Sequence, residues 1–128
     1  MELYKQYEFI LKENECIEKE QSKIRVAISN YENKKTENNL VKKELALLED
    51  DDVVYKLIGP ILVQQETGDA KIQVDSRIEM INKEIKKLEI NYQTNLKKID
   101  DNKKKQNDIQ AKLIQITRQL EQMKKEGK

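Results

Sequence analysis

Hydrophobic residues recur at alternating spacings of four and three through the second half of this chain, and no glycine or proline interrupts them before Gly127. Twelve of the fifteen positions are apolar or tyrosine. The positions are Val74, Ile78, Ile81, Ile85, Leu88, Tyr92, Asn95, Ile99, Asn102, Gln106, Ile109, Leu113, Ile116, Leu120 and Met123. A seven-residue repeat of this length predicts a left-handed coiled coil rather than a helix of a globular core.

The first half of the chain has the same spacing. Its positions are Leu3, Tyr7, Ile10, Asn14, Ile17, Gln21, Ile24, Ile28, Tyr31, Lys35 and Asn38. The repeat then slips by one three-residue step and restarts at Val41, Leu45 and Leu48. Four acidic residues at 49–52 follow, at the negative end of the helix dipole, so the first helix is predicted to span residues 1–49.

A short segment of β-branched and apolar residues separates the two helices. Gly59 and Pro60 divide it, and their backbone preferences suit a two-residue type II′ turn. We therefore predict a hairpin over residues 53–66 and a second helix over residues 69–125, capped by Asp69. The chain is predicted to be one mainly α domain of residues 1–128, with two long antiparallel coiled-coil helices joined by a central β-hairpin.

Placing Leu48 opposite Val74 predicts the register of the two helices, with paired residue numbers that add to about 122. Asn14 and Gln21 then lie opposite residues 108 and 101, close to Gln106 and Asn102. Two interpretations of this polar stretch are open. The polar side chains specify the register, or they form a flexible elbow in the arm.

Two regions expose more apolar surface than a two-helix arm can cover. Both faces of the hairpin are apolar near its turn and both strand edges are unpaired, so the hairpin is predicted to join other chains. Near the chain termini, Tyr4, Phe9, Leu11 and Ile114 lie beside the repeat positions, and this excess predicts a binding surface.

Composition argues against several classes of function. The chain has no histidine, one cysteine, a net charge of +1 and no apolar run near the ~20 residues of a membrane span. We therefore expect no enzyme activity, no cofactor, no metal site, and neither nucleic acid nor membrane as a partner. Cys16 is interpreted as an inert or mildly exposed thiol and Lys103–Lys105 as a solvated helix face. Lys56, the one charge among apolar hairpin residues, is either a guard of the strand edge or a salt-bridge donor inside an assembly.

The run Val54–Val63, followed by Ala70 and by Arg77–Ile81, resembles the β-class subunits of prefoldin. These motifs cover about a quarter of the chain. The segment Thr67–Asp69 departs from the family pattern, which has more acidic, helix-forming residues there, so it affects the expected start of the second helix.

The resemblance implies a cytoplasmic, ATP-independent holding chaperone. Two α-class and four β-class subunits join their hairpins into a double β-barrel, and the tips of six coiled-coil arms hold non-native proteins such as actin and tubulin for the group II chaperonin. The implied assembly residues are Val53, Val54, Tyr55, Leu57, Ile58, Gly59, Pro60, Ile61, Leu62 and Val63, within a barrel segment of residues 53–66. The implied client-binding tip consists of Leu3, Tyr4, Tyr7, Phe9, Ile10, Leu11, Ile114, Ile116, Leu120 and Met123.

A passive coiled-coil adaptor or tether is the alternative function. Its two ends would dock two partners without holding unfolded chains. The hairpin favours the chaperone, because a tether has no need to interrupt its helical seam at the midpoint.

Overall fold

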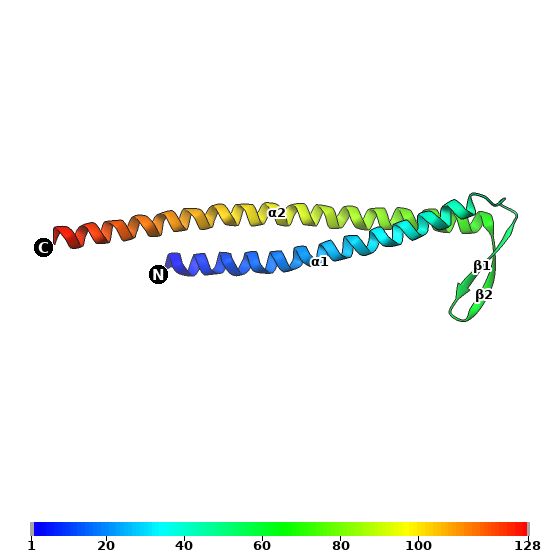
Figure 1. Ribbon diagram of the computed structural model, residues 1–128, viewed down its shortest axis with the longest axis horizontal. Helices are drawn as coiled ribbons and strands as arrows, with labels where there is room; N and C mark the ends of the chain where they lie inside the picture. Colours follow the sequence, from blue (N-terminus) through cyan, green and yellow to red (C-terminus); the bar gives the residue numbers. More distant parts are fainter. Residues whose placement is uncertain (1, 128) are drawn as a thin grey trace. The chain divides into compact units, whose positions relative to one another are not determined.

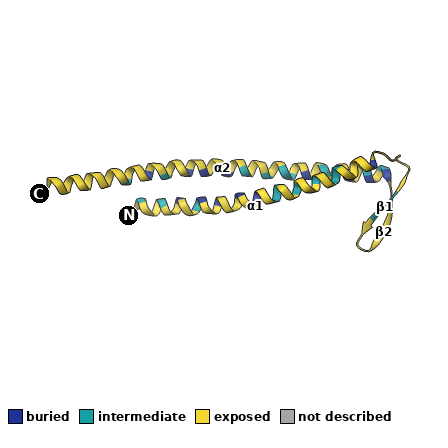
Figure 2. Cartoon of the chain, in the orientation of Figure 1, coloured by how far each residue is buried: buried dark blue, intermediate teal, exposed yellow. Residues whose placement is uncertain are grey.

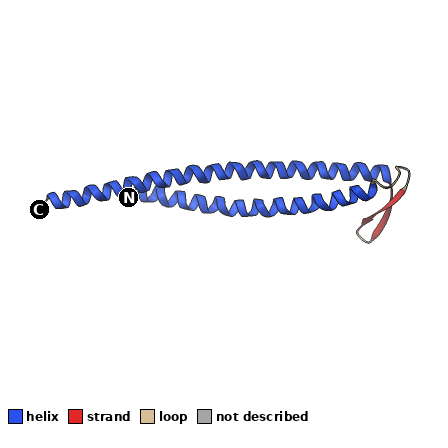
Figure 3. Ribbon diagram, turned by 45° about the horizontal axis from the view of Figure 1, so that its top comes forward, coloured by secondary structure: helices blue, strands red, loops and turns tan. Residues whose placement is uncertain are grey.

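The computed structural model describes residues 2–127 and contains four elements, α1 (Glu2–Leu45), β1 (Val53–Ile58), β2 (Ile61–Glu66) and α2 (Thr67–Glu126) (Figure 1). Two helices joined by a hairpin confirm the predicted fold class (Figure 3). The chain divides into two compact units. The hairpin unit comprises Arg25–Ile90, and the terminal unit comprises the residues up to Ile24 together with those from Asn91.

In the hairpin unit, β1 and β2 pair antiparallel with the predicted register. The partners are Val53 with Glu66, Val54 with Gln65, Tyr55 with Gln64, Lys56 with Val63, Leu57 with Leu62, and Ile58 with Ile61. Gly59 has a φ of 58°, which an L-residue rarely adopts, and Pro60 restricts the next φ to negative values. The two residues therefore make the predicted turn.

Both helix boundaries at the hairpin differ from the prediction. The helix α1 ends at Leu45, and the amide of Leu48 turns back to the carbonyl of Leu45 at 3.0 Å instead of continuing the helix. The helix α2 begins at Thr67, because the carbonyls of the acidic loop bind its first amides. The Thr67 amide donates to the Asp52 carbonyl at 2.8 Å, and the Gly68 amide donates to the Asp50 carbonyl at 3.1 Å.

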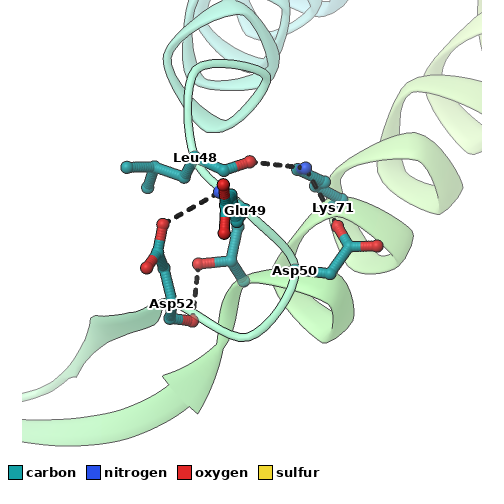
Figure 4. A network of polar contacts seen from close by, with 6 residues as sticks. Leu48, Glu49, Asp50, Asp52 and Lys71 are labelled. Atoms are coloured by element: carbon teal, nitrogen blue, oxygen red, sulfur yellow. Dashed lines mark hydrogen bonds and ion pairs between the residues drawn. The ribbon is translucent and has the colours of Figure 1, made fainter.

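Side chains reinforce this junction (Figure 4). The fully buried Thr67 also donates its hydroxyl to the Asp52 carbonyl at 2.7 Å. Lys71 of α2 reaches back to the Leu48 carbonyl at 2.9 Å and to the Asp50 carboxylate at 3.0 Å. The acidic residues that were predicted only to stop the first helix therefore also hold the start of the second.

The core of the hairpin unit is small. Leu45, Ala70 and Val74 form a buried cluster, and Val54 and Ile78 pack against it. Leu45 therefore lies beside Val74, where Leu48 was predicted to lie. Leu48 is exposed.

In the terminal unit, segments of α1 and α2 lie antiparallel and bury residues three or four positions apart toward each other (Figure 2). The buried apolar side chains are Ile10, Ile17, Ile24, Ile99 and Ile109. The predicted register is wrong here by about six residues. Asn14 pairs with Asn102 and Gln21 pairs with Asn95, so the paired numbers add to 116. The predicted partners 108 and 101 were derived from Leu48, which is not part of the seam.

Candidate functional sites

The hairpin leaves most of its apolar residues uncovered. Leu57 and Leu62 face each other across the strands and are 68% and 64% exposed. Only Val54, Lys56 and Gln65 are partly covered, and they share one face of the two strands. Folding of the hairpin onto its own helices covers Val54 alone among the apolar residues of the two strands. We call the exposed apolar residues of β1 and β2 the hairpin surface; they are Val53, Tyr55, Leu57, Ile58, Ile61, Leu62 and Val63.

The predicted tip residues separate into three groups in the terminal unit. Tyr4, Phe9, Leu11 and Ile114 are exposed beside the seam, as expected from their positions. Leu3 and Tyr7 are half-buried in the seam. Ile10 is buried in it, so it supports the tip and offers little surface to a partner.

Ile116, Leu120 and Met123 form the third group. They occupy seam positions of α2, yet all three are exposed, and Met123 is 66% exposed. The observed register explains this difference, because it places residue 114 opposite Glu2 and so leaves residues 116–126 beyond the described part of α1. The predicted sum of about 122 would place Leu3 beside residue 119, next to Leu120, and this placement is wrong for the same reason.

An open groove of about 660 Å³ runs between the two helices of the terminal unit. Its apolar lining residues are Phe9, Ile10 and Ile109. Charged residues of both signs also line it, namely Glu2, Lys5, Glu13, Lys105, Asp108 and Lys112. These charged residues and Ile109 were not predicted to be part of the site. Their spacing of three and four residues along each helix could have indicated the groove, because this spacing places them on one face of the helix.

The buried polar residues are paired directly. Asn102 donates to Asn14 at 2.9 Å, and Asn95 donates to Gln21 at 3.1 Å. Gln21 in turn donates to the carbonyl of Tyr92 at 3.0 Å. Within residues 2–127 no buried side-chain nitrogen or oxygen lacks a partner. Complete pairing supports the interpretation that these residues specify the register. Gln106, which was predicted to lie among them, is not part of these pairs.

The described residues contain no group of acidic, histidine or cysteine side chains that could hold a metal ion. Cys16 is an exposed free thiol. No helix within residues 2–127 is both long enough and apolar enough to cross a membrane.

Comparison with known proteins decides the family. The family model described as prefoldin subunit matches residues 8–113. The chain belongs to the prefoldin family of chaperone subunits. The match includes the whole hairpin surface and most of the groove in the terminal unit.

Individual prefoldins are similar over most of their length. Prefoldin subunit 6 of Mus musculus is 38% identical over 112 residues, which cover 88% of this chain and 85% of the mouse protein. Prefoldin subunit 6 of Homo sapiens is 39% identical over 99 residues, which cover 77% of this chain and 74% of the human protein. These relatives confirm the resemblance that the hairpin motif indicated.

A solved prefoldin structure supports the fold independently. The prefoldin beta subunit from Thermococcus strain KS-1 superposes with a TM-score of 0.73 and 22% identity, covering 84% of this chain and 92% of that chain. The β-class arrangement of two helices and one hairpin is therefore shared.

Proposed function

We propose that this chain is one subunit of a cytoplasmic prefoldin hexamer that holds non-native proteins without ATP. Its hairpin surface joins other α-class and β-class subunits. Its tip binds clients of the actin and tubulin type, which the complex passes to the group II chaperonin. Holding a client requires no bond to be made or broken, so we assign the chain no catalytic residue and no cofactor.

The exposure of the hairpin is the observation that supports assembly most directly. A two-stranded hairpin is marginally stable alone in water, and this one exposes seven large apolar side chains. Both outer strand edges are also available for pairing with strands of other subunits. Burial of these side chains in a barrel would recover about 25 cal/mol for each Å² of apolar surface removed from water.

The groove and its exposed neighbours support client binding at the tip. A groove lined by apolar residues and by charges of both signs suits segments that expose apolar side chains but differ in sequence. Phe9, which is 67% exposed, adds aromatic surface beside the seam, and the exposed Met123 adds a flexible side chain beyond the described part of α1. Each such contact is weak, and several arms acting on one client would give useful affinity.

Co-purification and a holding assay test the proposal together. A tagged chain expressed in a eukaryotic host should recover five other small coiled-coil subunits in a six-chain particle, as measured by native mass spectrometry. The purified particle should suppress the aggregation of denatured actin without ATP. A particle that assembles but gives no protection would favour the passive tether, and a chain that recovers no prefoldin subunits would contradict the proposal.

A further inference from the structure

A second, smaller cavity lies in the hairpin unit where the strands meet the helices. Its volume is about 180 Å³. Apolar side chains from the helices and from β1 contribute to its wall, among them Leu45, Val54 and Val74. Lys56 of β1 and Arg77 of α2 also line it.

The charges at this cavity are unbalanced. None of its lining residues is an aspartate or a glutamate. Among residues 2–127, the polar contact of the Lys56 ammonium is with the neutral Oε1 of Gln73, at 3.4 Å. Arg77 has no ion pair or hydrogen bond through its side chain within residues 2–127.

Two of the other cations of this unit are paired with carboxylates. Lys42 lies 2.9 Å from Asp75, and Lys71 lies 3.0 Å from Asp50. The two cations at the cavity thus differ from these neighbours, since both stand beside apolar surface without a counter-charge.

Lys56 points toward the helices of its own unit. It shares a strand face with Val54, and that face packs against these helices. Its ammonium reaches Gln73 of α2.

We propose that this cavity is a socket for an acidic side chain carried by the hairpin of a neighbouring prefoldin subunit. The proposal rests on the assembly role proposed above, and it specifies that the neighbouring subunit contributes a carboxylate. The guanidinium of Arg77 presents a planar set of donors that suits a carboxylate, and Lys56 adds a second positive charge. The apolar wall would remove the pair from water and strengthen its attraction.

Chemical cross-linking of the assembled complex tests the socket directly. A water-soluble carbodiimide condenses an ammonium with a carboxylate that contacts it, forming an amide while the carbodiimide takes up the released water as a urea. We expect Lys56 to be joined to an aspartate or glutamate in the hairpin of another subunit, as identified by peptide mass spectrometry. The Lys71–Asp50 pair, at 3.0 Å, is the internal positive control. Formation of the Lys71–Asp50 link without any link from Lys56 to another subunit's hairpin would overturn the proposal.

Charge-removing variants give a second test in the full complex. Lys56→Gln with Arg77→Gln should make the subunit dissociate about tenfold faster and should weaken the dependence of dissociation on salt. The control is Lys43→Gln with Lys86→Gln, which removes the same charge from exposed helix positions of the hairpin unit. Circular dichroism of each isolated chain checks that the helices are intact. Equal dissociation rates for the two double variants would overturn the proposal.

The socket and the proposed function can fail separately. If the wild-type chain forms no particle with other prefoldin subunits, the proposed function fails and the socket fails with it. If the particle forms and only the cross-link and the rate difference are missing, the socket alone is wrong.

Discussion

Asn102 donates a hydrogen bond of 2.9 Å from its Nδ2 to the Oδ1 of Asn14, inside the buried seam of the terminal unit. The two side chains are 6% and 7% exposed. An amide at a seam position costs stability compared with an aliphatic residue, and it favours the register in which it meets another amide. The pair therefore defines which residues of α1 and α2 face each other in this unit.

Replacing one member of this pair should destabilise the folded chain more than replacing both. Asn102→Ile should lower the free energy of unfolding by about 1–3 kcal/mol, because Asn14 is left buried without this partner. Asn14→Ile together with Asn102→Ile should unfold at a higher temperature than the single variant, since no amide is then stranded. Thermal unfolding followed by circular dichroism measures both.

Disulfide formation between introduced cysteines tests whether the same pair specifies the register of the helices. In a Cys16→Ser background, Ile17→Cys with Ile99→Cys should form a disulfide in the observed register, and Ile17→Cys with Gln106→Cys reports a shift of one heptad. The shifted disulfide should increase when both asparagines are replaced by isoleucine. If the shifted disulfide is no more abundant than in the parent, the pair does not specify the register.

Negative charge on the hairpin surface should prevent assembly. Leu57→Asp with Leu62→Asp places two carboxylates opposite each other in the sheet, where burial without a partner is very costly. The assembled fraction should fall at least about tenfold while the helices remain formed. Native mass spectrometry of the mixed subunits measures the fraction.

The matched control moves the same charge to the helices. Val26→Glu with Leu40→Glu changes two exposed apolar side chains of α1 in the hairpin unit. This variant should assemble like the wild type. Normal six-chain particles from the hairpin variant would contradict the assembly role of the hairpin surface.

Polar substitutions beside the seam should weaken client holding without unfolding the arm. Tyr4→Ser, Phe9→Gln, Leu11→Gln and Ile114→Gln change exposed side chains that the seam does not use. The unfolding temperature should be nearly unchanged, and roughly twice as much complex should be needed to suppress aggregation of denatured actin, because other arms still contribute contacts.

Substitution elsewhere on the arm controls for a general loss of apolar surface. Val26→Gln, Leu40→Gln, Met80→Gln and Leu96→Gln also remove four exposed apolar side chains. This variant should protect actin as well as the wild type. Equal protection by the tip variant would mean that its apolar residues are ordinary surface, and the tether would then be the better account.

The last part of α2 should be dispensable for stability. Removal of residues 116–128 deletes Ile116, Leu120 and Met123, which are exposed although they continue the heptad repeat. The unfolding temperature of the isolated chain should fall by less than about 2 °C, the change expected for under about 0.5 kcal/mol. A larger fall would show that these residues pack in the seam, as the heptad repeat alone predicted.

The Thr67 hydroxyl should contribute measurably to the junction between hairpin and helix. Thr67→Val removes its bond to the Asp52 carbonyl in a fully buried place, so the free energy of unfolding should fall by about 1–2 kcal/mol. Thr67→Ser retains the hydroxyl donor, so its free energy of unfolding should fall by less than that of Thr67→Val. Urea unfolding of the isolated chains compares them, and a Thr67→Val variant as stable as the wild type would contradict the role of the hydroxyl.

Local patterns in the sequence determined most of the architecture. The heptad positions from Val74 to Leu113 are all buried or half-buried, as predicted. The strand pairing around Gly59 and Pro60 also agrees with prediction, because the turn geometry determines the register of a two-residue hairpin. The excess of apolar residues beside the seam at Tyr4 and Phe9 could be read directly, since exposure of an off-seam position follows from helical geometry alone.

Tertiary structure decided the register of the helices and the limits of the seam. A heptad repeat is nearly unchanged by a shift of seven residues. Periodicity alone therefore does not determine which residue pairs with Asn14 or whether Leu120 is buried. The choice depends on long-range contacts, namely the loop carbonyls that start α2 at Thr67, the packing of Leu45 on Val74, and the pairing of Asn14 with Asn102. The cavity beside Lys56 and Arg77 depends on the same contacts, since 20 residues of chain separate these two cations and only packing of the hairpin against α2 brings them together.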